Sequence, residues 1–385
     1  MEKVRLGIIG VGNMGSSHIK NALQGKMPEI EITAVADIKP DRLEWAKEQL
    51  PEVKTFDTTS ALMDSGEVDA VLIATPHYDH PPLVIEALEK GLHAMSEKPA
   101  GVYTKQVREM NAVADKSDKK FGIMFNQRTN CLYRKAKEIV DSKDFGELKR
   151  VTWIITDWYR TQAYYNSGGW RATWSGEGGG VLLNQCPHQL DLWQWICGMP
   201  EKITAICHEG KWHNIEVEDD VMIYAQYPNG ATGTFITTTG DYPGTNRLEI
   251  TLDKAKLICE NGKLHIFELS IGTDDYTKNA EDGFGSIEYK EYDAELDGRN
   301  DQHIEVMNKF AASILRDEPM TASGQEGING LTISNAAFLS SWLGETVSLP
   351  IDEDKFYELL QEKIKNSTFK KEVKEIVNEN MDSTY

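Results

Sequence analysis

A glycine-rich hexapeptide near the N-terminus leaves little freedom in how this chain can fold. Gly10-Val11-Gly12-Asn13-Met14-Gly15 follows the apolar run Val4–Gly10 and precedes the helical spacing of Ser16–Gln24. Between a strand and a helix, the first glycine permits a tight turn and the second lets the backbone approach a pyrophosphate. The third lets helix and strand pack closely. Because a helix N-terminus also attracts phosphates, the hexapeptide predicts a dinucleotide site.

Strand-like and helix-like segments alternate along the N-terminal third of the chain. Apolar runs such as Ile30–Asp37 and Ala70–Ala74 are separated by segments with helical spacing, which is typical of βαβ units and a parallel sheet. After about residue 127 the pattern changes. Consecutive strand-like segments run from Ile203 to Leu269, and Pro228-Asn229-Gly230 between two of them predicts a hairpin turn. A second, mostly antiparallel sheet is therefore expected.

Further strands are expected at His93–Ser96 and Leu148–Ile155, and helices at Cys131–Ser142, Val181–Ile196, His303–Leu315, Ile328–Leu343 and Lys355–Lys365. The helix over Val181–Ile196 is closed by Gly198. The highly charged end from Lys363 to Tyr385 indicates a solvated helix, with a fraying tail or an oligomer contact as alternatives.

Charge and composition exclude several classes of protein. The 385 residues carry 41 Lys+Arg against 61 Asp+Glu, a net charge of -20, which disfavours nucleic acid and anionic membranes as partners. No apolar run approaches the roughly 20 residues that span a bilayer. The five cysteines form no CxxC pair, so neither a disulfide framework nor a zinc finger is expected. With no signal peptide recognised, a cytoplasmic location is expected.

An acidic residue at the end of the second apolar run bears on cofactor choice. A carboxylate at Asp37 would accept hydrogen bonds from the adenosine ribose and repel a 2′-phosphate, so NAD is favoured over NADP. Lys39 and Arg42 leave NADP open, because either could meet a 2′-phosphate.

Two tripeptides follow successive predicted strands. Ala74-Thr75-Pro76 and Glu97-Lys98-Pro99 stand where ligands bind in an open parallel sheet, beyond the carboxyl ends of the strands. A lysine just before a rigid proline is well placed to reach a substrate hydroxyl.

A further motif lies far along the chain, where Gly178-Gly179-Gly180 is followed by Gln185, His188 and Asp191. Together, these motifs resemble those of the glucose–fructose oxidoreductase / inositol dehydrogenase / rhizopine-catabolism (Gfo/Idh/MocA) family. The resemblance covers essentially the whole chain. It implies an α/β fold with a doubly wound NAD-binding Rossmann domain over residues 1–127. Residues 128–385 would form a substrate-binding and oligomerisation domain with a large, mostly antiparallel open sheet, and the active site would lie between the two domains.

The resemblance also implies three catalytic residues. Oxidation of an alcohol removes the O–H proton while hydride leaves the same carbon, and a histidine suits that proton transfer. His188 is expected to be the general base, and Lys98 to bond the same oxygen and stabilise alkoxide character. Asn184, four residues before His188, is expected on the same helix face, where it would orient the hydroxyl. Many relatives carry Asp at the position of Asn184, so the division of proton transfer between Lys98 and His188 stays open.

The remaining expected contacts come from the same loops and from an aromatic stretch with two interleaved arginines. Packing in the sheet and an oligomer interface are the alternatives for this stretch. Its members are Trp153, Trp158, Tyr159, Arg160, Tyr164, Tyr165, Trp170, Arg171 and Trp174. Aromatic faces stack on sugar rings and arginines bond hydroxyls. No catalytic metal is expected, and His77 and His80 are assigned to the loop that the resemblance places beneath the nicotinamide. His80 is expected to begin a helix and to fix this loop. The expected cofactor contacts are Gly10, Gly12, Asn13, Met14, Gly15, Asp37, Arg42, Thr75, Pro76, His77, His80, Glu97, Lys98, Asn126 and Arg128. The expected substrate contacts are Lys98, Arg128, Tyr159, Tyr165, Trp170, Arg171, Asn184 and His188.

The sequence thus predicts an NAD-dependent dehydrogenase that acts on a secondary ring hydroxyl of a sugar or glycoside. The resemblance suggests the C3 hydroxyl and a 3-keto product. Two alternatives stay open: a redox-neutral, NAD-dependent enzyme that cleaves glycosides, and a non-catalytic sensor of NAD and sugar on the same fold. The expected partners are a small-molecule sugar or glycoside and further copies of the chain in a homo-oligomer.

Overall fold

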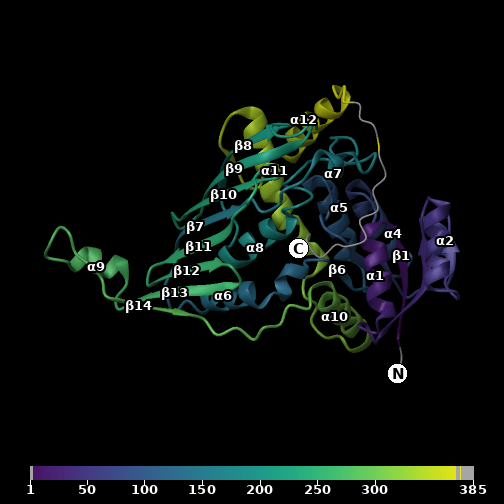
Figure 1. Ribbon diagram of the computed structural model, residues 1–385, viewed down its shortest axis with the longest axis horizontal. Helices are drawn as coiled ribbons and strands as arrows, with labels where there is room; N and C mark the ends of the chain where they lie inside the picture. Colours follow the sequence, from purple (N-terminus) through teal and green to yellow (C-terminus); the bar gives the residue numbers. More distant parts are fainter. Residues whose placement is uncertain (1–2, 370–372, 374–385) are drawn as a thin grey trace.

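The computed structural model describes residues 3–369 and 373. Its N-terminal part is a six-stranded parallel sheet covered by helices (Figure 1). The strands are β1 (Val4–Ile9), β2 (Ile30–Ala36), β3 (Lys54–Phe56), β4 (Ala70–Ile73), β5 (His93–Ser96) and β6 (Phe121–Ile123). They bond in the order β3-β2-β1-β4-β5-β6, which confirms the doubly wound parallel sheet. The order reverses between β1 and β4, so a crevice opens beyond their carboxyl ends.

Both faces of this sheet are buried, because successive strand residues point to opposite sides. Ile8 packs in one apolar cluster and Ile9 in the other. Helices α1 (Asn13–Leu23) and α2 (Pro40–Gln49) contribute to the cluster that contains Ile8. Helices α3 (Thr59–Met63), α4 (His80–Glu89) and α5 (Thr104–Ala114) contribute to the other.

A helix from much later in the chain also packs on the N-terminal sheet. Helix α10 (Gln302–Arg316) buries Val306, Met307 and Phe310 in the same cluster as Ile8. The core of the N-terminal part is therefore completed by a segment from beyond the expected boundary at residue 127.

The second sheet has nine strands in the order β14-β13-β12-β11-β7-β10-β9-β8-β15. Every pair is antiparallel except the central β7 and β10, which confirms the mostly antiparallel sheet. The expected hairpin turn lies between β9 and β10, with Gly230 at a φ of +85°. The strands are β7 (Leu148–Ile155), β8 (Lys202–Glu209), β9 (Glu218–Gln226), β10 (Thr232–Thr238), β11 (Asn246–Leu252), β12 (Ala255–Glu260), β13 (Lys263–Leu269), β14 (Tyr289–Asp293) and β15 (Val347–Ser348).

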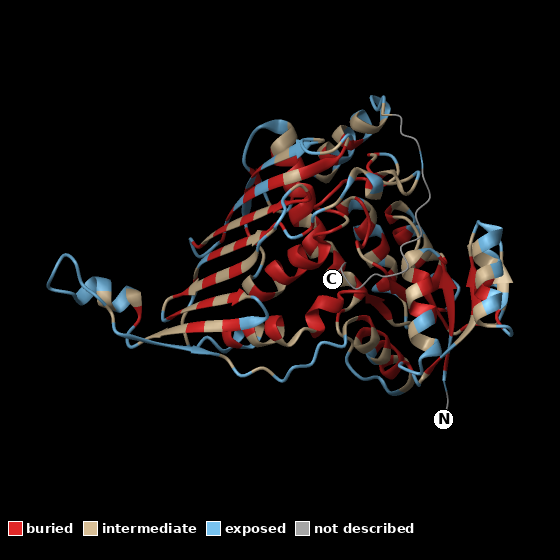
Figure 2. Cartoon of the chain, in the orientation of Figure 1, coloured by how far each residue is buried: buried red, intermediate tan, exposed pale blue. Residues whose placement is uncertain are grey.

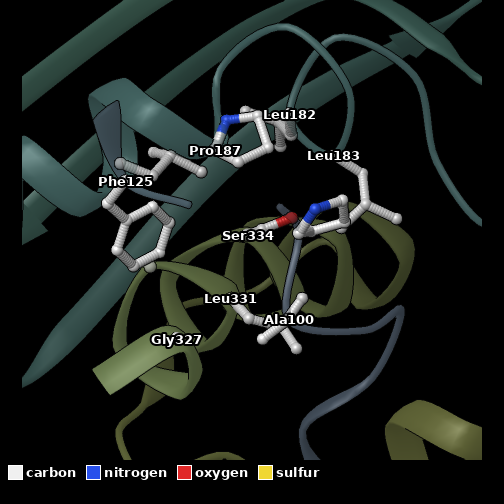
Figure 3. Close-up of a pocket in the computed structure, with 11 residues that line it drawn as sticks. Ala100, Phe125, Leu182, Leu183, Pro187, Gly327, Leu331 and Ser334 are labelled. Carbon is white, nitrogen blue, oxygen red and sulfur yellow. The ribbon is translucent and has the colours of Figure 1, made fainter. Parts of the chain in front are cut away.

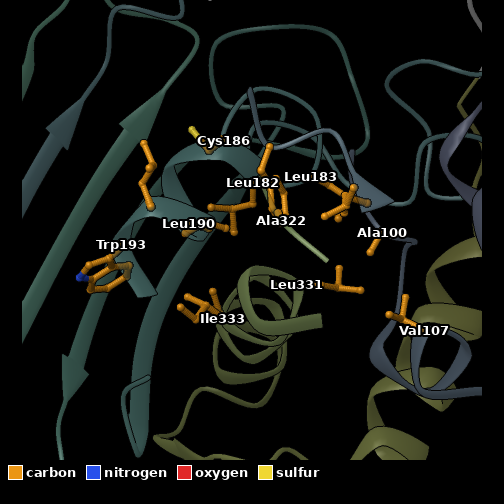
Figure 4. Packing of buried hydrophobic residues seen from close by; sticks show 14 of the residues in the cluster. Ala100, Val107, Leu182, Leu183, Cys186, Leu190, Trp193, Ala322, Leu331 and Ile333 are labelled. Carbon is orange, nitrogen blue, oxygen red and sulfur yellow. The ribbon is translucent and has the colours of Figure 1, made fainter. Parts of the chain in front are cut away.

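One face of the large sheet is covered and the other is open. Helices α6 (Cys131–Ser142), α8 (Pro187–Cys197) and α11 (Gly327–Leu343) pack against the covered face and against each other. Figure 4 shows Leu190 and Trp193 of α8 within this packed layer. Burial alternates along the strands (Figure 2), and Ile206, Met222 and Tyr224 are exposed on the open face.

The remaining elements are short or lie at the periphery. They are η1 (His77–Asp79), η2 (Asn126–Thr129), α7 (Gln162–Asn166), α9 (Thr273–Asn279), η3 (Gly324–Glu326) and α12 (Glu353–Lys365). Within the described residues, no helix is both long and apolar enough to cross a membrane.

Two expected helices differ from the structure or lie beyond it. The expected helix Val181–Ile196 begins only at Pro187, the start of α8. The Glu218 carboxylate accepts the backbone N–H groups of Gly180 (2.7 Å) and Leu182 (2.9 Å), which holds the preceding segment in turns. Of the expected charged helix at the C-terminus, α12 ends at Lys365, and most of the rest lies outside the described residues.

Candidate functional site

The glycine loop has the geometry of a dinucleotide cradle. Gly10 adopts a φ of +90°, and a Cβ on Gly15 would lie 2.0 Å from the Gly10 carbonyl oxygen. Nothing lies within 4 Å of the Cβ position of Gly12, so the middle of the loop faces open space. Asn13 and Met14 open helix α1, which has no side-chain cap. The tight turn and the close helix packing are confirmed, and the exposed loop fits a pyrophosphate.

Asp37 and Arg42 both contact this loop. The Asp37 carboxylate accepts the backbone N–H of Val11 (2.7 Å) and that of Lys39 (2.9 Å). The Arg42 Nε–H donates to the Val11 carbonyl oxygen (2.7 Å), and Nη2 donates to the Ser16 hydroxyl (2.6 Å). The Asp37 carboxylate and the Arg42 guanidinium therefore lie side by side, where an adenosine ribose would lie.

His80 ties together the loops that follow β4 and β5. Its Nε2 lies 2.8 Å from the Thr75 carbonyl oxygen and its Nδ1 lies 2.7 Å from that of Pro99. The expectation that His80 begins a helix and fixes this loop is confirmed, since α4 begins at this residue. His77, one residue beyond Pro76, reaches instead to the C-terminal half, with its Nδ1 3.0 Å from the Glu177 carbonyl oxygen.

Lys98 reaches from the N-terminal to the C-terminal part of the chain, and its charge acts on His188. Lys98 Nζ donates to the backbone carbonyl of Asn184 (3.0 Å). His188 is buried, and neither of its ring nitrogens has a hydrogen-bond partner among the described residues. Burial, followed by the charges of Lys98 and His303, holds the pKa of His188 well below its usual value. Its imidazole is therefore neutral at neutral pH, and a ring nitrogen can accept a hydrogen bond.

Asn184 does not share a helix face with His188. It lies in the turns before α8, where its own backbone N–H donates to Gly180 (2.9 Å). Its side-chain Nδ2 donates to the carboxylate of Glu177, a residue that is almost fully buried. This contact fixes the amide so that Oδ1 is the atom left for a ligand. A buried carboxylate thus stands beside Asn184, although the motif itself lacks one.

Two expected contacts from the end of the N-terminal sheet are engaged in the protein interior. The Arg128 guanidinium forms two hydrogen bonds with Asp191 (2.7 and 2.8 Å) and one with Glu326 (2.6 Å). Asn126 is fully buried and its Nδ2 donates to Gln302 at the start of α10. The geometry of both residues is that of structural contacts between segments.

Rings of the aromatic stretch pack around Arg171, whose charge acts on Lys98. The Arg171 guanidinium lies between the rings of Tyr164 (4.6 Å) and Trp170 (4.5 Å), and its Nη1 donates to the Tyr164 hydroxyl (2.8 Å). Tyr165 is buried and bonds the Thr239 hydroxyl (2.7 Å), so its contacts are those of a packing residue.

Other parts of the aromatic stretch point elsewhere. Tyr159 is 46% exposed and its ring packs against that of Tyr242. A cavity lined in part by Pro99 has a volume of about 10 Å³, and its other lining residues include Ala100 and Leu331 (Figure 3). That volume holds at most one water, so this cavity is a packing gap and not a substrate site.

Sequence reasoning missed four residues of the site. Tyr164 lies in the aromatic stretch and Glu177 directly precedes the Gly178-Gly179-Gly180 segment, but neither residue belongs to a recognised motif. The other two residues are His18 and His303. Both interact with Glu97, which was expected to contact the cofactor. Glu97 is buried, with its Oε1 2.9 Å from His18 Nε2. Only the fold brings these residues together.

Comparisons with known proteins agree with this geometry. Residues 4–125 match the family described as "Oxidoreductase family, NAD-binding Rossmann fold", and residues 133–258 match the "GFO/IDH/MocA C-terminal domain". Myo-inositol 2-dehydrogenase of Thermotoga maritima is 24% identical over 362 residues, which cover 91% of this chain and 99% of that protein. Rhizopine catabolism protein MocA of Rhizobium meliloti is 31% identical over 199 residues, which cover 51% of this chain and 58% of that protein.

A solved structure has the same overall architecture. The WlbA dehydrogenase of Chromobacterium violaceum, crystallised with NADH and UDP-GlcNAcA, is 28% identical and has a TM-score of 0.77. The alignment covers 91% of this chain and 97% of that protein. The expected fold class and the expected NAD cofactor are thereby confirmed. Together the two family matches cover most of the chain, which therefore belongs to the Gfo/Idh/MocA family of NAD-binding oxidoreductases.

Proposed function

We propose that the protein is an NAD-dependent dehydrogenase that acts on a secondary hydroxyl of a sugar or a related ring. The observation that carries the proposal is His188, a buried imidazole with no partner at either nitrogen among the described residues, on which the charge of Lys98 acts. A buried polar group without a partner is costly unless a ligand completes it. The relatives named above include dehydrogenases of inositol and of a sugar nucleotide, which supports the same class of substrate.

The residues present fit NAD. The glycine loop and the uncapped start of α1 would hold the pyrophosphate, and Asp37 would meet the adenosine ribose. When bound, the cofactor supplies a nicotinamide ring that accepts hydride.

The side chains around Lys98 can handle the other half of the reaction. The O–H proton of the alcohol passes to neutral His188, while the C–H bond breaks and its electron pair leaves with the hydrogen as hydride. Lys98 donates a hydrogen bond to the same oxygen and stabilises its developing negative charge. Asn184, fixed by Glu177, accepts a hydrogen bond from an adjacent hydroxyl through its Oδ1.

The rings around Arg171 give a finer proposal for the substrate. The rings of Tyr164 and Trp170 hold the Arg171 guanidinium, which suits hydroxyls or an acidic group. Oxidation at C3 of a glycoside rests on the resemblance of the stretch from Trp170 to Trp195 alone.

A spectrophotometric screen tests the proposal. Purified protein is mixed with NAD, and separately with NADP, against inositols, aldoses, uronates, aryl glycosides and UDP-GlcNAcA, and NADH is followed at 340 nm. His188→Ala is compared with His265→Ala, a histidine on the partly exposed strand β13. We expect NADH from wild type and His265→Ala but not from His188→Ala. Equal rates in all three proteins would refute the role of His188.

The same wells separate the alternatives. Free aglycone without NADH would indicate redox-neutral glycoside cleavage. Binding of NAD and sugar with neither product would indicate a sensor. With a glycoside that does react, the position of the new carbonyl, read by NMR, tests the C3 proposal.

We also propose that copies of the chain associate through the open face of the large sheet. The exposed side chains of Ile206, Met222 and Tyr224 supply an apolar surface there. Sedimentation velocity of wild type and Tyr224→Lys tests this, and a monomeric wild type would refute it.

A further inference from the structure

A buried acid–histidine cluster contains Glu97, the residue that precedes Lys98 in the chain. Glu97 comes from the loop after β5, His18 from α1 and His303 from α10. His18 Nε2 and Glu97 Oε1 are 2.9 Å apart, and these side chains are 1% and 5% exposed. The rings of His18 and His303 meet edge to face, with centroids 5.6 Å apart. Segments far apart in sequence thus converge on the residue that precedes the expected catalytic lysine.

The contacts of Glu97 are those of an ionised carboxylate. Because a carboxylate only accepts hydrogen bonds, the His18 Nε2–H must be the donor. The other oxygen, Oε2, is buried and has no hydrogen-bond partner in the part of the chain that the structure describes. Burial raises the pKa of Glu97, but the His18 hydrogen bond and the electrostatic interactions with His18, His303 and Lys98 leave it below its usual value. A buried negative charge of this kind needs a cation nearby.

Lys98 is the neighbouring cation, and its surroundings otherwise disfavour its charge. Burial lowers the pKa of Lys98, Glu97 raises it, and Arg171 and Arg160 lower it again. Cys186 raises it slightly, and the imidazoles of His77, His188 and His303 also interact with Lys98. Among these groups, Glu97 is the acid that opposes the arginines.

We propose that Glu97, oriented by His18, is a positioning residue that keeps Lys98 in its ammonium form so that Lys98 can donate to the reacting oxygen. The proposal rests on the dehydrogenase function proposed above, but the charge state of Lys98 can be measured without substrate. Burial lowers the pKa of His303 to about 4, so His303 is neutral at neutral pH.

Competitive acetylation of the apoprotein measures the charge state directly. Trace acetic anhydride labels only the neutral amine, and mass spectrometry gives the labelled fraction of Lys98 at each pH. In Glu97→Gln we expect the pKa of Lys98 to fall by roughly one unit or more, so its labelled fraction rises about tenfold below that pKa. Glu97→Asp keeps the charge and should restore most of the wild-type curve. Glu86→Gln, the same substitution on helix α4, is the matched control and should not move the curve.

The pH profile of kcat supplies a second readout that a purely structural role would not move. The proposal holds if Glu97→Gln shifts the labelling curve and the pH profile of kcat in the same direction along the pH axis, with a smaller change in KM. A folded Glu97→Gln with an unchanged labelling curve overturns it.

Histidine variants replace the test if Glu97→Gln does not fold. His18→Leu removes the donor and His18→Gln keeps one, so a lower Lys98 pKa in the first variant alone supports the proposal. Equal curves for His18→Leu and His18→Gln overturn it. A shifted labelling curve in a protein that oxidises no sugar would instead refute the proposed function and leave the electrostatic assignment intact.

Discussion

Replacing Arg128 with methionine separates a structural role from a role in ligand binding. The guanidinium bonds Asp191 through Nε (2.8 Å) and Nη2 (2.7 Å), and the two side chains are 3% and 1% exposed. Removing one partner of a buried ion pair costs about 3–5 kcal/mol, because the other charge stays buried without compensation. Gln194 also donates to Asp191 (3.0 Å), so we expect the lower end, about 3 kcal/mol of unfolding free energy at pH 8.

The loss should depend on pH with a definite sign. Burial already raises the pKa of Asp191 above its usual value, even with Arg128 lowering it. Without Arg128 the folded-state pKa rises further above the unfolded value. Between these two values the folded state holds a proton that the unfolded state has released, so stability increases as pH falls. The deficit of Arg128→Met should therefore be larger at pH 8 than at pH 5.

Urea denaturation, followed by tryptophan fluorescence, gives the unfolding free energies of wild type and Arg128→Met at pH 8 and at pH 5. Lys120→Met, which breaks an exposed pair with Asp317, is the control and should change stability by less than about 1 kcal/mol. Adding Asp191→Asn to Arg128→Met should recover part of the loss, because no buried charge remains. A loss below about 1 kcal/mol at pH 8, or an equal loss at pH 5, would refute the buried-pair argument. A loss of NAD affinity larger than the loss of folded protein would instead favour the ligand contact expected from sequence.

Three further predictions concern the cofactor loop and the amide beside it. Gly15→Ala places a Cβ 2.0 Å from the Gly10 carbonyl oxygen, so we expect weaker NAD binding by calorimetry and a lower Tm; unchanged values would show that the loop can shift. Asp37→Ala should weaken NAD binding more than NADP binding, and an equal loss for both would contradict the ribose contact. Glu177→Gln weakens the hold on the Asn184 amide; the loss of a charged hydrogen bond, about 1.5–3 kcal/mol, should raise KM for the sugar roughly tenfold or more. An unchanged KM would show that this amide orientation does not matter for binding.

Local sequence signals were sufficient for the regular elements and insufficient for the turns between them. Strands β5 and β7 and helix α6 begin and end where apolar spacing placed them. The short elements β3 and α3 were missed, because three and five residues carry too little periodicity.

The site was predictable only as far as its motifs. Placing Asn184 on one helix face with His188 was wrong, because Glu218 on strand β9 binds the turn at Gly180. A Cβ at Gly180 would lie 1.9 Å from the Glu218 carbonyl oxygen, and helical spacing contains no information about such a contact. The cluster around Glu97 was invisible for the same reason, since its members are neighbours only in the fold.

The return of helix α10 to the N-terminal sheet has a consequence for biosynthesis. Val306, Met307 and Phe310 complete the apolar layer that contains Ile8, so that layer stays partly uncovered until the ribosome has passed residue 316. At roughly 5–20 residues per second, the wait after β6 lasts on the order of ten to forty seconds. A nascent chain stalled in that interval would expose apolar surface of the N-terminal sheet to chaperones. A protein truncated after residue 127 would keep that surface exposed permanently.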